Sequence, residues 1–348
     1  MSTTRGQVPR DELLRHWQAM IGAGEAVPGS GLAATADALR GSPWPEDLRG
    51  TPLIIDTDIG GDGDDALAVA AAARCAPELQ LVLTGDESNG DRARFARHLL
   101  DLMGRHDVAT VAGISLGGTP YFVVEHLIPE TVSRQPADVV AAVRRVLDST
   151  DGPVRWVGMA PLSNLAHVLA AVPDAAARLR VTQMGGALRY RNPETAEHNV
   201  RLDVPAAHQV LAAVAAGLLP TPEFVASEVT FTPSIEVTAD SALYTWMSSE
   251  GAPAWAGLLA DHLDAWFSRF YPGSMQHDAL TLSAALDLPF VDSEPTRIAM
   301  DGIGRTTVSD TGTVLRWSIT AEYDPFMRWL TQTLAGAPAA VPATGGNG

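Results

Sequence analysis

The chain has 348 residues, 46% of them hydrophobic, and a net charge of −17 at pH 7. That length can bury the core of one large α/β domain or of two ordinary ones, whereas the acidic balance excludes nucleic-acid polymers and anionic membrane surfaces as partners. All 24 basic residues are arginines, which excludes mechanisms that need a Schiff-base or phosphate-binding lysine. The single cysteine, Cys75, excludes an internal disulfide and a cysteine-based metal site, and it is expected to pack in the core.

The first 50 residues are predicted to be an N-terminal helical extension. An amphipathic pattern predicts a helix from about Arg10 to Ile21, and Gly, Ala and Pro dominate the connection that follows. Residues 1–10 lack the apolar core of a signal peptide, and no apolar run is long enough to cross a bilayer. We therefore expect a cytoplasmic protein.

The rest of the chain is organised around the stretch from Pro52 to Val69. The apolar run from Leu53 to Ile55 predicts a buried strand, an acidic and glycine-rich turn follows it, and Ala66 to Arg74 are predicted to form a helix. Five carboxylates fall within ten residues: Asp56, Asp58, Asp62, Asp64 and Asp65. With no Cys or His nearby, this cluster favours a hard cation, Ca²⁺ or Mg²⁺, that offsets the repulsion, although a solvated acidic turn is the plainer alternative.

Strands and helices alternate from residue 52 onward. Further strand patterns lie at residues 79–84, 108–112, 154–158 and 181–184, and helical patterns at 91–104, 136–149, 163–171, 204–216, 253–270 and 277–286. Residues 297–300 and 314–320 are predicted to form a late hairpin through the turn at Asp310-Thr311-Gly312. This alternation predicts an α/β fold, Rossmann-like, with a largely parallel central sheet and helices on both faces. Residues 51–335 are expected to form one catalytic domain, and residues 336–348 a disordered tail.

Polar motifs follow the predicted strands at their carboxyl ends, where open α/β sheets bind ligands. They are Gly85-Asp86-Glu87-Ser88-Asn89, Met159-Ala160-Pro161-Leu162-Ser163-Asn164, Met184-Gly185-Gly186 with Glu197-His198-Asn199 and Asp203-Val204-Pro205, and Gln276-His277-Asp278. Asn164 alone is more typical of a helix cap than of a ligand, and Asp203 is expected to cap the next helix. Together with the acidic turn, these motifs resemble those of the nucleoside hydrolases, a family of metal-dependent N-ribohydrolases, in the family's order across about residues 52–320.

The resemblance implies a Ca²⁺ site formed by Asp58, Asp65, Asp278 and the main-chain carbonyl group of Met159. Asp58 would also accept a proton from the water that attacks the N-glycosidic bond. His277 would protonate the leaving base, a role that suits the ordinary pKa of a histidine near neutrality. The residues implied in substrate binding are Asp64, Asn89, Asn192, Glu197 and Asn199 for the ribose, and Phe270 and Tyr271 for the base.

Several points stay open in the sequence. Asp86 is the alternative to Asn89, and Asp56 is expected to orient the acidic turn rather than to bind a ligand. The acidic turn departs from the family pattern by Ile59 in place of Pro and by two extra residues before Asp64. Residues 117–130 lack the His/Gly-rich loop that many members carry over the base, so the base preference stays open.

Three other functions are compatible with part of the sequence. A phosphatase of the haloacid dehalogenase type shares the Asp56-Thr57-Asp58 pattern, but it usually needs a lysine, and the chain has none. A non-catalytic nucleoside or Ca²⁺ binder on the same fold, and a hydrolase of a specialised ribosyl compound in a biosynthetic pathway, remain alternatives. The resemblance further implies a role in purine or pyrimidine salvage and a homodimer or homotetramer.

Overall fold

The computed structural model describes residues 10–41, 48–117 and 121–336. The chain divides into two compact units, residues 1–47 and 48–348. In the first unit, α1 (Arg10–Glu25) covers the helix predicted from the sequence. A second helix, α2 (Gly31–Gly41), lies where we expected an irregular connection, so that expectation was wrong. Gly24 lies tightly against α2, because a Cβ atom there would be 2.4 Å from the Cβ of Ala36.

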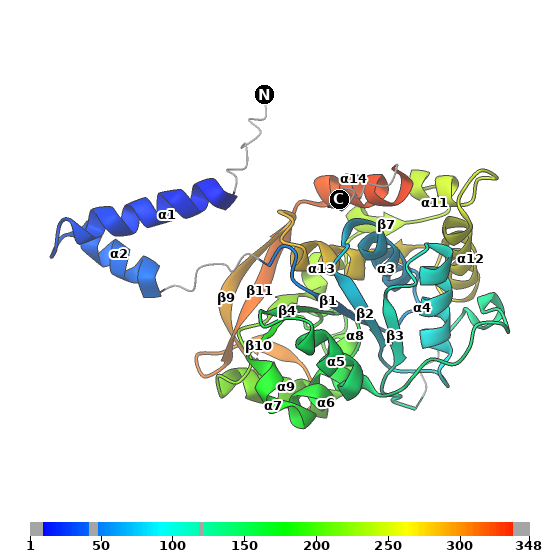
Figure 1. Ribbon diagram of the computed structural model, residues 1–348, viewed down its shortest axis with the longest axis horizontal. Helices are drawn as coiled ribbons and strands as arrows, with labels where there is room; N and C mark the ends of the chain where they lie inside the picture. Colours follow the sequence, from blue (N-terminus) through cyan, green and yellow to red (C-terminus); the bar gives the residue numbers. More distant parts are fainter. Residues whose placement is uncertain (1–9, 42–47, 118–120, 337–348) are drawn as a thin grey trace, which may run out of the picture. The chain divides into compact units, whose positions relative to one another are not determined.

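A nine-stranded sheet forms the centre of the second unit, in the order β10-β9-β11-β6-β5-β4-β1-β2-β3 (Figure 1). All neighbours from β11 to β3 run parallel, and β9 and β10 run antiparallel to their neighbours. The bounds are β1 Leu53–Thr57, β2 Leu79–Thr84, β3 Ala109–Ala112, β4 Val154–Gly158, β5 Leu179–Met184, β6 Glu223–Val225, β9 Val291–Met300, β10 Thr306–Val308 and β11 Thr313–Ala321.

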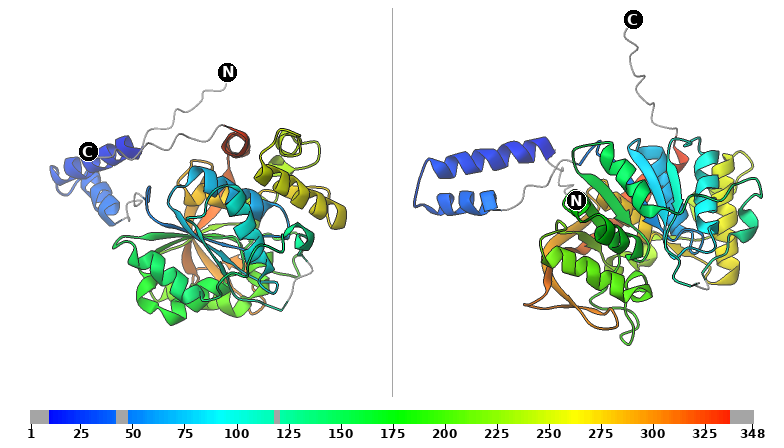
Figure 2. Two further views of the ribbon diagram at one scale, coloured as in Figure 1. Left: turned by 45° about the vertical axis from the view of Figure 1, so that its right-hand side comes forward. Right: turned by 60° about the horizontal axis from the view of Figure 1, so that its bottom comes forward.

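Helices cover both faces of this sheet (Figure 2). One face carries α3 (Asp64–Cys75), α4 (Asp91–Leu102), α12 (Ala254–Arg269), α13 (His277–Ala285) and α14 (Tyr323–Ala335), and the other carries α5 (Val139–Asp148), α6 (Ser163–Ala171), α7 (Pro173–Ala176) and α9 (Val204–Ala215). Successive side chains of β1 alternate between the two faces: Leu53 and Ile55 belong to one hydrophobic core, and Ile54 to the other. The predicted α/β class with a largely parallel sheet is therefore confirmed.

Short elements fill the connections between the longer helices and strands. They are η1 (Glu125–Leu127), α8 (His198–Leu202), α10 (Ser227–Thr230), η2 (Pro233–Ile235), α11 (Ala242–Met247) and the antiparallel pair β7 (Glu236–Val237) and β8 (Ser274–Met275). None of these was predicted from the sequence. The connections matter because they bring residues from distant parts of the chain over the ends of β1, β4 and β5.

Two sequence predictions need correction. β9 and β11 do pair antiparallel, but residues 310–312 connect β11 to β10 and not to β9, so the predicted hairpin turn was wrong. Cys75 ends α3 and is exposed rather than packed in the core. In the described part of the chain, no helix is long and apolar enough to cross a membrane. The predicted tail, apart from Gly336, lies outside the described residues.

Candidate active site

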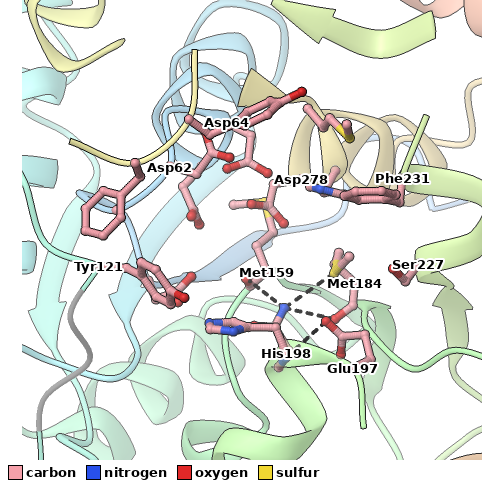
Figure 3. Close-up of a pocket in the computed structure, with 18 of the residues that line it drawn as sticks. Asp62, Asp64, Tyr121, Met159, Met184, Glu197, His198, Ser227, Phe231 and Asp278 are labelled. Carbon is pink, nitrogen blue, oxygen red and sulfur yellow. Dashed lines mark hydrogen bonds between the residues drawn. The ribbon is translucent and has the colours of Figure 1, made fainter. Parts of the chain in front are cut away.

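A cavity of about 490 Å³ opens at the carboxyl edge of the sheet (Figure 3). Its wall combines carboxylates, aromatic rings, two histidines and two arginines. The lining residues are Asp58, Gly61, Asp62, Asp64, Asp65, Tyr121, Met159, Met184, Tyr190, Arg191, Glu197, His198, Asn199, Arg201, Ser227, Phe231, Trp266, Phe270, Tyr271, Gly273, Met275, His277 and Asp278. A cavity of this volume is in the range of small-molecule sites in proteins.

Three buried aspartates meet in the cavity. One carboxylate oxygen from each of Asp64, Asp65 and Asp278 lies within 4.8 Å of the other two. The first two open α3, directly after the acidic turn, and Asp278 is in the first turn of α13. Because the three groups are oxygen donors at one point, this cluster could hold a metal ion of the hard, oxygen-binding class. Asp58 lines the same cavity but is not a member of this tight group.

Burial and mutual repulsion raise the pKa of each carboxyl group in the cluster. The pKa of Asp64 rises to about 7, mainly through burial and then through the charge of Asp58. The pKa values of Asp65 and Asp278 rise well above 3.8, again mainly because of burial, with the neighbouring carboxylates adding to the effect. The pKa of Asp62 is raised in the same way. A cation would reverse this balance, so the donor set fits a divalent ion.

The turn between β1 and α3 is closely packed, and the side chain of Arg92 binds its backbone. Gly60 has φ +101°, and a Cβ atom there would lie 2.8 Å from Val124 Cγ2 and 2.9 Å from Phe122 Cε2. The buried guanidinium of Arg92 donates to the carbonyl oxygens of Asp58 and Ile59, the second bond being 2.9 Å long. A side chain at Gly60 would therefore disturb the loop that presents the carboxylates.

Two buried polar residues support β1 from below the cavity. Asn164 Nδ2 donates to Asp56 Oδ1 at 2.8 Å and to the carbonyl oxygen of Thr84 at 3.0 Å. Burial raises the pKa of Asp56 to about 8, against the lowering effect of the Asn164 bond. Neither residue lines the cavity, which agrees with the expected supporting role of Asp56. The hydroxyl group of Thr57 donates to Asp65 Oδ1 and so orients one carboxylate of the cluster.

The predicted Met159 and Asn199 lie together at the ends of β4 and β5. Asn199 Nδ2 donates to the carbonyl oxygen of Met159 at 3.2 Å and to that of Met184 at 3.3 Å (Figure 3). Glu197 is the N-cap of α8: its carboxylate accepts the backbone N–H groups of Gly186, Asn199 and Val200 at 3.1–3.2 Å. Asp203 caps α9 as expected, by accepting the N–H of Ala206 at 3.0 Å.

His277 lies in the cavity beside Asp278, as the sequence predicted. Its Nδ1 is 2.7 Å from Thr230 Oγ1, and the ring of Phe231 stacks on it with centroids 6.2 Å apart. Burial, followed by the charges of Arg191 and His198, lowers its pKa to about 3. The expectation that the pKa of His277 suits proton donation near neutrality was therefore wrong, because the neutral imidazole is the stable form there.

Aromatic rings form one side of the cavity. Phe270 stacks on Trp266 with centroids 4.9 Å apart and meets Tyr121 edge-on at 5.2 Å. Phe270 and Tyr271 are 42% and 51% exposed, so part of each side chain is accessible to a ligand. Trp266 lines the cavity as well and donates from Nε1 to the carbonyl oxygen of Gly273 at 3.0 Å.

The structure does not bring Asn89 or Asn192 to the cavity. Asn89 is exposed, with φ +53°, in the turn before α4. Asn192 is exposed too, and its Oδ1 accepts the N–H of Glu194 at 3.1 Å within its own turn. Asp86, the alternative to Asn89, is buried 3.7 Å from the guanidinium of Arg92 and does not line the cavity either.

Several cavity residues were not found by sequence reasoning. Asp62 lies in the inserted part of the acidic turn, and its place in the carboxylate run was the one available signal. Tyr121 lies in the segment that departs from the family pattern. Tyr190, Arg191, Ser227 and Phe231 come from loops and short helices whose positions no motif indicates. His198 lies inside the Glu197-His198-Asn199 motif and Arg201 follows it, but the motif assigns neither of them a role.

The sequence profile of the inosine-uridine preferring nucleoside hydrolases matches residues 53–332. The chain therefore belongs to that family. The non-specific ribonucleoside hydrolase RihC of Shigella boydii serotype 18 is 27% identical over 327 residues, 82% of this chain and 98% of that protein. RihC of Escherichia coli O1:K1 / APEC is 33% identical over 180 residues, 45% of this chain. This match covers 56% of the length of that RihC protein. The chain thus aligns with little more than half the length of the most similar relatives.

Solved structures show the same fold. A plant nucleoside hydrolase, the PpNRh1 enzyme, superimposes with a TM-score of 0.70 at 21% identity, over 82% of this chain and 99% of its own. The expected family and fold are thus confirmed by sequence and by architecture.

Proposed function

We propose that the protein hydrolyses the N-glycosidic bond of a ribonucleoside to ribose and the free base. The observation that carries the proposal is that three buried aspartates meet in one cavity whose side wall is aromatic. Family membership supports the reaction class, and the cavity has a volume suited to a nucleoside. The acidic cluster can bind the hydroxyl groups of the sugar, and the aromatic wall can stack on the base.

The cavity carboxylates fit a divalent ion with oxygen ligands, and we assign Ca²⁺. The ligands would be Asp58, Asp65, Asp278 and the carbonyl oxygen of Met159, with Asp64 close enough to join them. Bound Ca²⁺ would lower the pKa of a coordinated water and polarise the ribose hydroxyl groups.

Asp58 would accept the proton of the attacking water as the water oxygen bonds to C1′ and the C1′–N bond breaks toward the base. Asp64 and Asn199 would bind the 2′- and 3′-hydroxyl groups, since a carboxylate with an amide matches two groups that both donate and accept. Glu197, which accepts the backbone N–H of Asn199, would fix that residue and would bind the sugar. The carboxylates would stabilise the positive charge that develops on the ribose ring.

Phe270 and Tyr271 would stack on the base, together with Trp266. His277 would meet the base as a neutral hydrogen-bonding group, because its lowered pKa of about 3 leaves no proton to transfer at neutral pH. The cytoplasmic location remains a prediction from the sequence pattern, and the homodimer or homotetramer and the role in salvage remain predictions from the resemblance.

The proposal is tested by incubating the protein with purine and pyrimidine ribonucleosides and measuring the release of reducing sugar. We expect release that a chelator abolishes and Ca²⁺ restores, and that Asp58→Asn reduces by about 1,000-fold or more. Asp310→Asn, a change in an exposed turn, is the matched control and should keep full activity.

No release from any nucleoside at saturating Ca²⁺ would refute the proposal. Release that is unaffected by a chelator would refute the assigned role of the metal and leave the hydrolase activity standing.

A further inference from the structure

His198 is a cavity residue to which neither motif nor family gives a role. It is the first residue of α8, and Arg201 lies one turn further along the same helix. The guanidinium Nη2 of Arg201 is 3.0 Å from His198 Nδ1. Because a guanidinium can only donate, Nδ1 must accept in this contact, and the proton of the neutral ring is then on Nε2.

Arg201 is itself fixed in position. Its Nη1 donates to the hydroxyl group of Tyr190 and to the carbonyl oxygen of Ala196, both at 3.3 Å. The spacing of three residues on α8 explains why His198 and Arg201 meet, since side chains three apart share one helix face. The contact therefore fixes both the tautomer and the orientation of the imidazole ring.

The ring of His198 lies at the aromatic side of the cavity. It meets the ring of Tyr121 edge-on, with centroids 5.7 Å apart (Figure 3). Tyr121 in turn contacts Phe270 and Trp266. These are the rings that are placed to stack on a base. With Nδ1 occupied by Arg201, the Nε2–H is the group that His198 can offer to a ligand beside them.

We propose that His198 donates a hydrogen bond from Nε2 to the leaving base and that Arg201 is the residue that positions it. The inference rests on the proposed N-riboside hydrolysis and adds the group that stabilises the departing base. As the C1′–N bond breaks, its electron pair moves to the base, and the developing negative charge is stabilised by the Nε2–H. The base then takes its proton from solvent, while the proton of the attacking water goes to Asp58.

The size of the expected effect follows from the chemistry of the leaving group. Removing one preorganised donor from a developing negative charge typically lowers kcat about 100-fold or more. A base anion needs this donor, whereas 4-nitrophenolate is a stable anion without it. Hydrolysis of 4-nitrophenyl β-D-ribofuranoside should therefore be nearly insensitive to the loss of His198.

The test compares His198→Phe and His198→Gln on inosine, uridine and the nitrophenyl riboside in the presence of Ca²⁺. His198→Phe keeps a ring but no donor, and we expect kcat on the nucleosides to fall about 100-fold with little change on the nitrophenyl riboside. His198→Gln places an amide N–H near the position of Nε2 and should recover part of the loss. His106→Phe, at an exposed histidine outside the cavity, is the control.

A second readout does not depend on turnover. Long-range ¹H–¹⁵N correlation spectra of the imidazole nitrogens should show the Nε2–H tautomer of His198, and Arg201→Met should turn it into a mixture of tautomers. Equal losses on all three substrates in His198→Phe, or no loss on nucleosides, would overturn the inference while N-riboside hydrolysis stands. No hydrolysis of any riboside by the unchanged protein would refute the proposed function, and the inference with it.

Discussion

At the scale of single residues, Asp56 shows how strongly the fold perturbs its carboxyl groups. Its side chain is buried under the cavity and accepts one hydrogen bond from Asn164. Burial raises its pKa from 3.8 to about 8. Between these two pKa values the carboxyl group stays protonated in the folded chain but ionises in the unfolded chain. The free energy of unfolding is therefore highest at low pH and falls as the pH rises toward 8.

Asp56→Asn should therefore stabilise the metal-free protein in alkaline solution. Asparagine keeps an oxygen that can accept from Asn164 but carries no charge, so the free energy of unfolding at pH 8 should rise by about 2 kcal/mol or more, with a much smaller change at pH 4. Urea denaturation of the chelated protein at both pH values measures the difference. An equal effect at the two values would contradict the buried-charge explanation.

The pH dependence of activity tests the neutral state of His277. Because its pKa is lowered to about 3, this residue should contribute no ionisation between pH 5 and 8. His277→Gln should lower kcat about 10-fold or more by removing contacts to the base, yet leave the acid limb of the kcat/KM profile where it is. A limb near pH 6.5 that disappears in the variant would show that His277 titrates in the working enzyme.

The predicted aspartates all line the cavity, although the tight group contains Asp64, expected at the ribose, and not Asp58. The two predicted asparagines that lie outside the cavity were misplaced for a physical reason. Asp58, Asp64, Asp65 and Asp278 adjoin predicted elements, β1, α3 and α13, whose ends converge at one edge of the sheet. The direction of Asn89 depends instead on a loop backbone with φ +53°. Such torsions follow from the tertiary environment of the turn rather than from hydrophobic periodicity.

At the scale of elements, the turn between β1 and α3 depends on Gly60. Its φ of +101° disfavours any side chain, and a Cβ atom would also contact Val124 and Phe122 at 2.8–2.9 Å. Two separate penalties therefore act at this position: backbone strain and steric overlap.

Gly60→Ala should destabilise the protein by more than Gly217→Ala. Gly217 also has a positive φ, +70°, but a Cβ atom there would meet nothing within 4 Å, so that variant carries the backbone penalty alone, about 1 kcal/mol. Thermal unfolding compares the two variants, and Ca²⁺ titration should show weaker binding for Gly60→Ala alone. Equal Ca²⁺ affinity in both would mean that the turn tolerates the added atom.

Some elements were predicted to the residue, and others were missed because they are too short to show a period or because a proline interrupts their pattern. The strands at 79–84 and 154–158 and the helix at 163–171 have the predicted bounds. β6 has three residues, too few to show a period, and it is recognised only by its pairing with β5 and β11. α14 was not predicted. It carries Pro325 in its first turn, where a helix tolerates proline, but in the sequence a proline usually indicates the end of a helix.

At the scale of the whole molecule, the buried carboxylates make stability depend on pH and on the metal together. Burial raises the pKa of Asp62, Asp64, Asp65 and Asp278 on folding. The unfolded chain loses these protons first as the pH rises above about 4, so the metal-free protein should lose stability progressively up to about pH 8. Bound Ca²⁺ should oppose that loss by favouring the ionised forms.

Ca²⁺ should accordingly raise the melting temperature much more at pH 8 than at pH 5, and its binding at pH 7 should release protons. Scanning calorimetry with chelator and with Ca²⁺ measures the first effect, and titration in a weakly buffered solution measures the second. Mg²⁺ at the same concentration is the comparison. A Ca²⁺-induced shift that is the same at both pH values would contradict linkage between the metal and the carboxylates.

The two ends of α3 carry groups that can both be labelled for spectroscopy. The helix begins with the site carboxylates Asp64 and Asp65 and ends with Cys75, which is exposed and is the only thiol of the chain. At a rise of 1.5 Å per residue the two ends are about 17 Å apart. With a fluorophore attached to Cys75 and luminescent Tb³⁺ in place of Ca²⁺, excitation energy should pass from the metal to the dye over the length of α3. This energy transfer would report occupancy of the metal site without any substrate.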